Sequence, residues 1–286
     1  MPKPRRSKKT PAAPADRPPV AERTPRAGRT PRTARAAGHL LRNPHVARPL
    51  PSLVFLSPLL AFYAFGLLWV RPDLAARADI LVRQIIAPLG VSGALAPLWL
   101  VIGILLLWHL VRRDPWRVPL PLVGLMAAET ALLTVPLFAI MAASSVILHG
   151  YLDLAMPAVW EAPSHAAAAP PVWLVVAMTS IGAGIYEELL FRLALVGGVL
   201  LAAQRVLNLR SSGLTVAVVL AAAAVFAGAH TMDDPRQFAW DSFLFRTAAG
   251  AYLGYVFVRR GFGIASGVHI VFDLVIKLGM VMRQAG

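Results

Sequence analysis

The 286-residue sequence contains no cysteine, and this absence excludes disulfide bonds, thiolate metal sites and cysteine nucleophiles. Charged residues are also scarce. Asp, Glu, Lys and Arg make up 15% of the chain, whereas 57% of it is hydrophobic. Soluble domains carry about a quarter charged residues, which they need to cover a surface exposed to water. The composition therefore predicts an integral membrane protein, surrounded mostly by lipid.

Several familiar hydrolytic motifs are missing as well. The sequence has no HExxH zinc motif and no GxSxG nucleophile elbow. It also lacks the Gly-Asp pair of the intramembrane aspartyl type. Any hydrolytic chemistry must therefore come from another arrangement of side chains.

Positive charge is concentrated in residues 1–49, which hold 13 Lys and Arg against 2 Asp and Glu. This segment is rich in Pro, Ala, Arg and Thr and has almost no large apolar residue before Leu40, so we expect a disordered tail. Nucleic-acid binding is disfavoured, because no aromatic residues are interleaved with the basic ones and hydrophobic sequence follows directly. Lys and Arg beside the first span instead predict a cytoplasmic N-terminus, suited to contact anionic lipid.

Hydrophobic runs long enough to cross a hydrocarbon layer of about 30 Å recur along the rest of the chain. The segment 71–92 differs, because its charges alternate with Leu and Ile at near-helical spacing, which predicts an interfacial amphipathic helix. We expect N-terminal transmembrane helices over 50–148 and a second helix bundle over 172–282. The whole predicts an all-α, polytopic membrane bundle of about seven spans, at 50–70, 94–111, 120–148, 172–201, 213–231, 242–258 and 263–282.

The loops between these spans predict an orientation. Lys and Arg collect at 112–117, 205–210 and 259–260, which places these loops in the cytoplasm, and acidic residues collect at 149–171 and 231–241. The Ala-, Arg- and Pro-rich composition suggests a GC-rich bacterium, so the bacterial inner membrane is the expected location. Within the last two spans, pairs of glycines four residues apart predict that these two helices approach each other closely.

Ionisable residues inside the spans are the most informative feature of the sequence. Each costs about 2.5–3.5 kcal/mol on insertion scales, so such residues usually face a polar interior and carry function. Glu129, His109 and Arg246 are interpreted as structural. The others are Glu187, Glu188 and Arg192 in the fourth span, His230 at the end of the fifth, and His269, Asp273 and Lys277 in the seventh.

Helical geometry indicates which of these residues share a face of their helix. Glu188 and Arg192 are four residues apart and share a face, which predicts an internal ion pair. Glu187 points about 100° away and can face a cavity. His269 and Asp273 also lie on one stripe. A carboxylate and imidazoles from separate helices can bind a water, remove its proton and stabilise an oxyanion, which are the parts of general-base hydrolysis.

The predicted depths of the two histidines differ. His230 falls near the outer end of its helix, whereas His269 falls about two turns from the inner end of its own. For the two to meet, the fourth, fifth or seventh span must be strongly tilted or broken, or the spans near 231–262 must be counted differently.

The order EExxxR, FxxxH and HxxxD on successive membrane helices resembles the CPBP family of CAAX-prenyl-protease-like and bacteriocin-processing intramembrane endopeptidases, relatives of the Ras-converting enzyme. The resemblance covers roughly residues 172–282. It implies that Glu187 is the general base that activates water together with His230. It also implies that His269 and Asp273 steady the oxyanion.

The resemblance implies supporting roles for two further residues, since Glu188 and Arg192 match the structural ion pair of the motif. Phe226 is interpreted as a packing residue that forms the wall beside His230. The prenyl-protease branch has Asn where this chain has Asp273, and an ionised Asp accepts hydrogen bonds but cannot donate one. Asp273 must then be protonated, orient His269, be offset by Lys277 or help to bind a metal.

Two questions stay open at the level of sequence. Glu187, His230 and His269 are candidate zinc ligands, although a mechanism that requires no cofactor is favoured.

The expected partner is a membrane-anchored protein or peptide: a lipid-anchored C-terminus, a bacteriocin-type leader or a C-terminal sorting signal. The alternative is a non-catalytic membrane scaffold or transporter-like protein whose polar cluster binds a ligand or proton.

Overall fold

A computed structural model of the chain describes residues 44–70, 75–149, 171–231 and 239–285. All of them belong to the compact unit Leu40–Gly286. Helices and no strands form within these ranges, which confirms the predicted all-α class. The predicted disordered tail lies outside the described residues except for its last six, and so do most of the two acidic loops.

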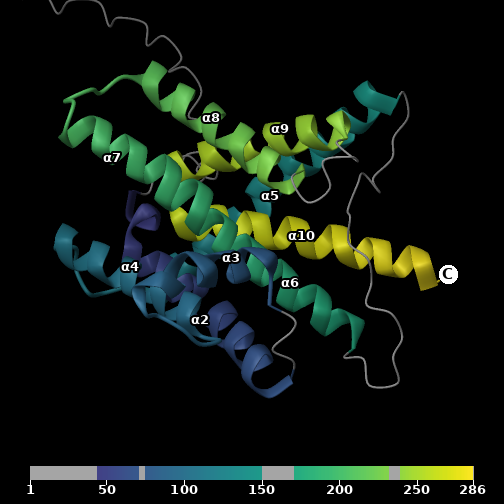
Figure 1. Ribbon diagram of the computed structural model, residues 1–286, viewed down its shortest axis with the longest axis horizontal. Coiled ribbons are helices and arrows are strands. Elements are labelled where there is room, and N and C mark those ends of the chain that lie inside the picture. Colours follow the sequence, from purple (N-terminus) through teal and green to yellow (C-terminus); the bar gives the residue numbers. More distant parts are fainter. Residues whose placement is uncertain (1–43, 71–74, 150–170, 232–238, 286) are drawn as a thin grey trace, which may run out of the picture. The chain divides into compact units, whose positions relative to one another are not determined.

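The N-terminal helices of this unit cover the region predicted to hold the first spans (Figure 1). Proline in the first turn begins α2 and α4, where its missing N–H removes no helical hydrogen bond. The elements are η1 (Pro44–Ala47), α2 (Pro49–Phe65), the π-helical η2 (Gly66–Val70), α3 (Arg77–Ile86), η4 (Ala87–Leu89), α4 (Ala96–Arg112) and α5 (Leu120–His149).

The C-terminal helices form the part that carries the predicted site. The first three of them are one unbroken helical run, and α8 packs along α9. The elements are α6 (Val172–Glu187), the π-helical η5 (Glu188–Gly197), α7 (Gly198–Arg205), α8 (Ser212–Thr231), α9 (Trp240–Arg260) and α10 (Phe262–Ala285).

Four described stretches are long and apolar enough to cross a membrane: Pro49–Trp69, Leu120–Leu148, Ser212–His230 and Phe262–Arg283. The helix Ala96–Arg112 is apolar but shorter. Large apolar side chains lie exposed along several of these helices, as expected where lipid is the solvent. The chain is therefore an integral membrane protein by its helices, and the number of seven spans stays a prediction.

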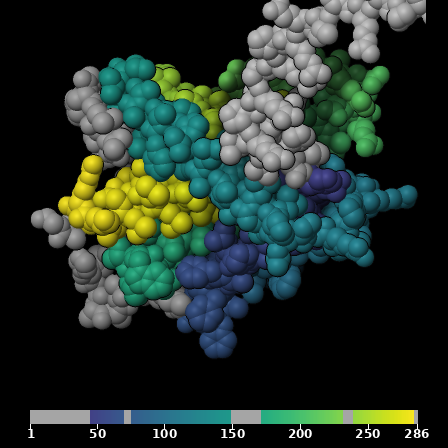
Figure 2. Space-filling model, turned by 180° about the vertical axis from the view of Figure 1, so that it is seen from behind, coloured from purple at the N-terminus to yellow at the C-terminus, as the bar shows by residue number. Residues whose placement is uncertain are grey.

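Helix α10 is the centre of the bundle. Its first turns are buried, with Ile264, Ala265 and Val268 fully enclosed. It packs against α2, α5, α6 and α9. Seen from behind, α10 reaches the surface between α5 and α6 (Figure 2). Residues of α10 are thus within reach of most other helices.

The turn from α9 into α10 is made by Gly261 alone. Its φ of 83° lies in the left-handed region that favours glycine. A side chain would also collide there, since a Cβ would lie 2.7 Å from the Cα of Ala47. Gly261 therefore sets the angle at which α10 enters the core.

The predicted role of the glycine pairs in the last two helices was wrong. Gly250 and Gly254 face α8, and a Cβ at Gly254 would lie 2.7 Å from Val219. Gly263 and Gly267 face α2 and α5 instead. The spacing of small residues correctly indicated close helix contacts, but it does not specify which helix lies opposite.

Helix α3 is fixed by one buried acid. Asp79 accepts a hydrogen bond from the hydroxyl of Tyr63 at 2.7 Å and two from Arg83 at 2.7 and 2.9 Å. The Tyr63 ring packs edge-on against Tyr186 at 5.7 Å, and Tyr186 directly precedes Glu187. Helix α3 is thus held against α2 and α6 beside the predicted site.

A second buried ion pair joins α5 to the end of α9. The Arg260 guanidinium contacts both carboxylate oxygens of Glu129, with Nη2 2.6 Å from Oε2. The structural interpretation of Glu129 agrees with this contact.

We expect Arg260→Met to lower the free energy of unfolding by about 3–5 kcal/mol, because it leaves the Glu129 carboxylate buried without this partner. Unfolding in mixed detergent–SDS micelles measures the change. The double variant Glu129→Leu/Arg260→Met is the matched control and should recover most of the loss. Equal destabilisation of the single and double variants would contradict this view of the pair.

Candidate active site

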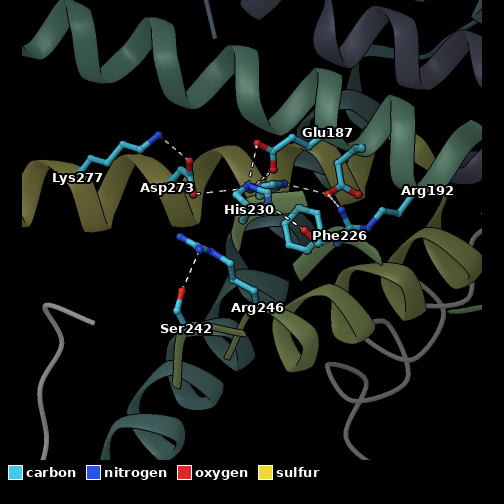
Figure 3. Close-up of polar contacts among 10 residues, drawn as sticks. Glu187, Arg192, Phe226, His230, Ser242, Arg246, Asp273 and Lys277 are labelled. Atoms are coloured by element: carbon cyan, nitrogen blue, oxygen red, sulfur yellow. Dashed lines mark hydrogen bonds and ion pairs between the residues drawn. The ribbon is translucent and has the colours of Figure 1, made fainter. Parts of the chain in front are cut away.

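The structure brings together the side chains that the sequence singled out on three separate helices (Figure 3). Glu187 is the last residue of α6, and its Oε1 lies 3.5 Å from Nε2 of His230 on α8. Its Oε2 lies 3.7 Å from Nε2 of His269 on α10. Both distances are longer than a typical hydrogen bond. The three side chains therefore face one shared point without bonding directly to each other.

The helix that carries Glu187 changes form at this point. It is α-helical up to Glu187 and π-helical from Glu188 to Gly197. Such π-helical turns are rare and frequently occur at functional sites. The helical run stays continuous through this change, and the strong tilt or break expected in one span stays a prediction. Figure 1 shows the α6–α7 run crossing α10 obliquely, which lets residues from different positions along their helices meet.

Close packing of α6 on α10 is set by Gly184. A Cβ at this position would lie 2.4 Å from Cγ1 and 2.9 Å from the backbone nitrogen of Ile270. Only glycine permits this approach, because the second contact is to backbone that cannot rotate away. The backbone contact places the end of α6 directly beside His269.

Glu188 and Arg192 form the predicted ion pair, with Oε1 3.0 Å from Nη1 and both side chains almost completely buried. Arg192 makes two further contacts. Its Nη2 donates to the carbonyl oxygen of Gly250 on α9 at 3.3 Å, and its guanidinium lies 4.4 Å above the Phe226 ring on α8. A desolvated cation over an aromatic face contributes about 2 kcal/mol. Arg192 thus joins three helices.

Glu188 has a second partner that sequence reasoning missed. Its Oε1 accepts a hydrogen bond from Nδ1 of His269 at 2.9 Å. Because Glu188 is ionised beside Arg192, the imidazole is the donor. The contact joins residues 81 positions apart. The four-residue spacing predicted only Arg192 as the partner of the Glu188 carboxylate. Nothing in the sequence indicated a second partner on α10.

The second imidazole is oriented by the backbone. Nδ1 of His230 lies 2.9 Å from the carbonyl oxygen of Phe226, and since a carbonyl only accepts, Nδ1 carries the hydrogen. In the neutral ring, Nε2 is then an acceptor, and it is the atom that faces Glu187. The Phe226 ring lies 4.7 Å from the imidazole and forms the wall expected beside it.

Asp273 forms an ion pair with Lys277. The lysine Nζ donates to Oδ2 at 2.7 Å, while Oδ1 lies 3.8 Å from Nε2 of His269. Of the roles considered for Asp273, an offset by Lys277 is the one present in the structure. An aspartate in this state cannot donate a hydrogen bond.

Exposure increases from one end of the cluster to the other. The Glu188 and Arg192 side chains are 0% and 2% exposed. Glu187 is 13% exposed, Asp273 19% and His230 27%. The ion pair therefore forms a closed floor, and the cluster opens on the side of Glu187, Asp273 and His230.

The candidate zinc ligands gain no support from the geometry. Within the described ranges, Glu187, His230 and His269 do not belong to any group of three or more His, Asp or Glu side chains arranged to hold a metal ion. The zinc alternative is not supported by these residues.

Sequence reasoning also missed Arg246. This residue was interpreted as structural, yet its side chain points from α9 toward the cluster (Figure 3). Its Nη1 donates to the Ser242 hydroxyl at 2.9 Å. The signal available in the sequence was its position, about one turn into the predicted sixth span.

The fold and the site together define the class of this chain. It is a helical membrane protein whose helices enclose a carboxylate–imidazole cluster. Residues 169–275 match the family model described as Rce1-like, type II CAAX prenyl endopeptidase Rce1-like. This match supports the predicted resemblance to the CPBP, CAAX-protease-like family, and it extends from just before α6 into α10. The matched family is one of CAAX-type intramembrane endopeptidases. No curated protein and no solved structure matches the chain.

We expect Arg192→Lys to lower the free energy of unfolding by about 1–3 kcal/mol. Lysine keeps the charge but cannot stack its head group flat on Phe226 while also reaching Gly250. Unfolding in mixed micelles measures the loss. Arg205→Lys, on an exposed cation of α7, is the matched control and should change the free energy by less than about 0.5 kcal/mol. Similar values for both variants would contradict the assigned contacts.

Proposed function

We propose that the protein is an intramembrane endopeptidase that hydrolyses a peptide bond of a membrane-anchored protein or peptide, using a water activated by Glu187 and His230. One observation carries the proposal: the Glu187 carboxylate lies 3.5 and 3.7 Å from the Nε2 atoms of two histidines on two other helices. A water molecule at this shared point can contact all three groups.

The hydrogen bonds of His230 favour one orientation of that water. Because Nδ1 of His230 donates to Phe226, its Nε2 accepts a hydrogen from the water. The Glu187 carboxylate accepts the other hydrogen. Both protons of the water then point at the protein, and an oxygen lone pair is left to attack the substrate carbonyl carbon.

In the proposed reaction, the water oxygen bonds to the carbonyl carbon while Glu187 takes one proton. The carbonyl oxygen becomes an oxyanion, which His269 stabilises in its cationic form. Nδ1–H is then bound by Glu188 and Nε2–H is available as the donor. As the C–N bond breaks, Glu187 passes its proton to the leaving nitrogen. The products are an amine and a carboxylic acid, which keeps the second proton of the water.

This mechanism assigns every step to the chain's own side chains and requires no metal. Asp273, paired with Lys277, acts by charge on His269 rather than by donating to the oxyanion. We place the protein in the bacterial inner membrane with a cytoplasmic N-terminus, which the basic residues of the first 49 positions support.

We expect Glu187→Gln to lower cleavage at least about 100-fold, since it removes the general base while keeping the shape of the side chain. His230→Ala should lower it comparably. Comparing the protein termini in membranes of cells with the wild type or each variant measures the loss, because a substrate terminus stays uncleaved.

Two controls accompany this comparison. Glu187→Asp keeps a carboxylate and should retain more activity than Glu187→Gln, while all variants should unfold like the wild type. Chelator treatment should leave the wild-type rate unchanged, and a loss restored by zinc would refute the metal-free mechanism alone. Unaltered termini in every variant would favour a membrane scaffold or transporter-like protein instead.

We expect Lys277→Met to slow cleavage about tenfold, because it leaves the Asp273 carboxylate without its cation next to His269. Adding Asp273→Asn should recover part of the rate, since a neutral amide needs no counter-charge and can donate a hydrogen bond. Rates of terminus formation in isolated membranes measure both variants. A double variant slower than the single one would contradict a charge role for Asp273.

A further inference from the structure

The turn between α4 and α5 joins two apolar helices. Helix α4 ends at Arg112, and α5 begins at Leu120 with a stretch, Leu120–Leu148, that is long enough to cross a membrane. Val111 and Leu120, on either side of the turn, are large apolar side chains that lie exposed. Exposed apolar side chains at the ends of such helices face lipid. The turn between them is therefore expected at the level of the lipid headgroups.

One aspartate in this turn holds two arginines side by side. Nε of Arg112 donates to Oδ2 of Asp114 at 2.8 Å, and Nε of Arg48 lies 3.4 Å from Oδ1 of the same carboxylate. Because Arg48 directly precedes α2, the contact joins the beginning of α2 to the end of α4, and these two helices pack together (Figure 1). Within the described residues, the terminal Nη groups of both guanidiniums make no hydrogen bond.

Two further arginines follow in the same turn. Arg113 ends α4 with a φ of 55°, and Arg117 lies a few residues further on. Both are exposed, and neither contacts an acid in the part of the chain that the structure describes. The turn therefore carries more positive charge than Asp114 offsets, and like charges brought together in this way favour the binding of an anion.

Trp116 fixes the position of the turn on α4. Its ring packs edge-on against the imidazole of His109, with 4.4 Å between the ring centroids, although 63% of Trp116 stays exposed. His109 itself is buried, which agrees with its structural interpretation. An exposed tryptophan beside arginines is typical of the membrane–water interface, where the amphipathic ring lies among the headgroups.

The surroundings of these arginines favour one kind of anion. Guanidinium groups bind phosphate through parallel hydrogen bonds, and several of them can surround one phosphate. The exposed apolar side chains beside the turn call for an apolar group on the same ligand. An anionic phospholipid supplies both a phosphate and acyl chains, whereas a soluble anion or an acidic protein surface supplies charge alone.

From these observations we infer that the turn between α4 and α5 is a binding site for an anionic phospholipid, whose phosphate is bound by four arginines: Arg48, Arg112, Arg113 and Arg117. Trp116 lies against the glycerol of the lipid, and the acyl chains lie along the apolar ends of α4 and α5. The bound lipid joins the beginning of α2 to the end of α4. The inference is independent of the proposed peptidase function, because it uses no residue of the carboxylate–imidazole cluster.

The test measures lipid binding to the purified full-length protein by native mass spectrometry. Phosphatidylglycerol is compared with phosphatidylcholine that has the same acyl chains, so that only the headgroup differs. We expect the wild type to bind its first phosphatidylglycerol at least about tenfold more tightly than phosphatidylcholine, since the second headgroup carries no net charge.

The double variant Arg113→Gln/Arg117→Gln should weaken binding of phosphatidylglycerol about 10- to 50-fold, because two cations at the headgroup are lost. The matched control Arg205→Gln/Arg210→Gln removes two exposed cations from another turn and changes the net charge equally. It should weaken binding less than about threefold.

Asp114→Asn separates an organised site from a diffuse positive surface. The substitution adds net positive charge, yet it removes the carboxylate that holds Arg48 and Arg112 together. We expect it to weaken binding of phosphatidylglycerol at least about threefold. Glu187→Gln should bind this lipid as the wild type does, which keeps the result separate from the outcome for the peptidase.

Three results would overturn the inference. Equal affinity of the wild type for the two lipids would refute recognition of an anionic headgroup. Equal losses in the two double variants would show a general attraction to positive charge without a site in this turn. Tighter binding by Asp114→Asn would show that the arginines act only through their summed charge.

Discussion

The structure depends on one buried carboxylate with two partners. Glu188 is bound by Arg192 on its own helical run and by His269 on α10, and all three side chains are almost completely enclosed. Arg192 extends the connection to Phe226 on α8 and to Gly250 on α9. Four helices therefore share one charge network. Because its members are almost completely buried, such a network holds them in one arrangement, since breaking any contact leaves a buried charge without its partner.

Much of this arrangement could be predicted from the sequence. Hydrophobic runs predicted the helices, and the four-residue spacing of Glu188 and Arg192 predicted their ion pair. The expectation that Glu187 turns away from that pair agrees with its position between two imidazoles. These predictions succeeded because they depend on the periodicity of a single helix.

The features that sequence reasoning missed all depend on how separate helices pack. The bond from His269 to Glu188 and the position of Arg246 beside the cluster require knowledge of which faces meet. The glycine pairs illustrate the same limit, because their spacing indicated a close contact but not its partner. The π-helical stretch that begins at Glu188 has no compositional signature.

The side chains of the cluster differ in exposure, so its buried part and its exposed part are constrained in different ways. The floor formed by Glu188 and Arg192 is sealed by packing and is out of reach of any substrate. The side chains of Glu187, Asp273 and His230, in contrast, are partly exposed, and Arg246 points toward them from the first turns of α9 (Figure 3). Under the proposed function, substitutions at the open side would change which peptides bind, while the sealed ion pair would keep the helices in place. A scaffold of this design would serve different substrates without repacking its interior.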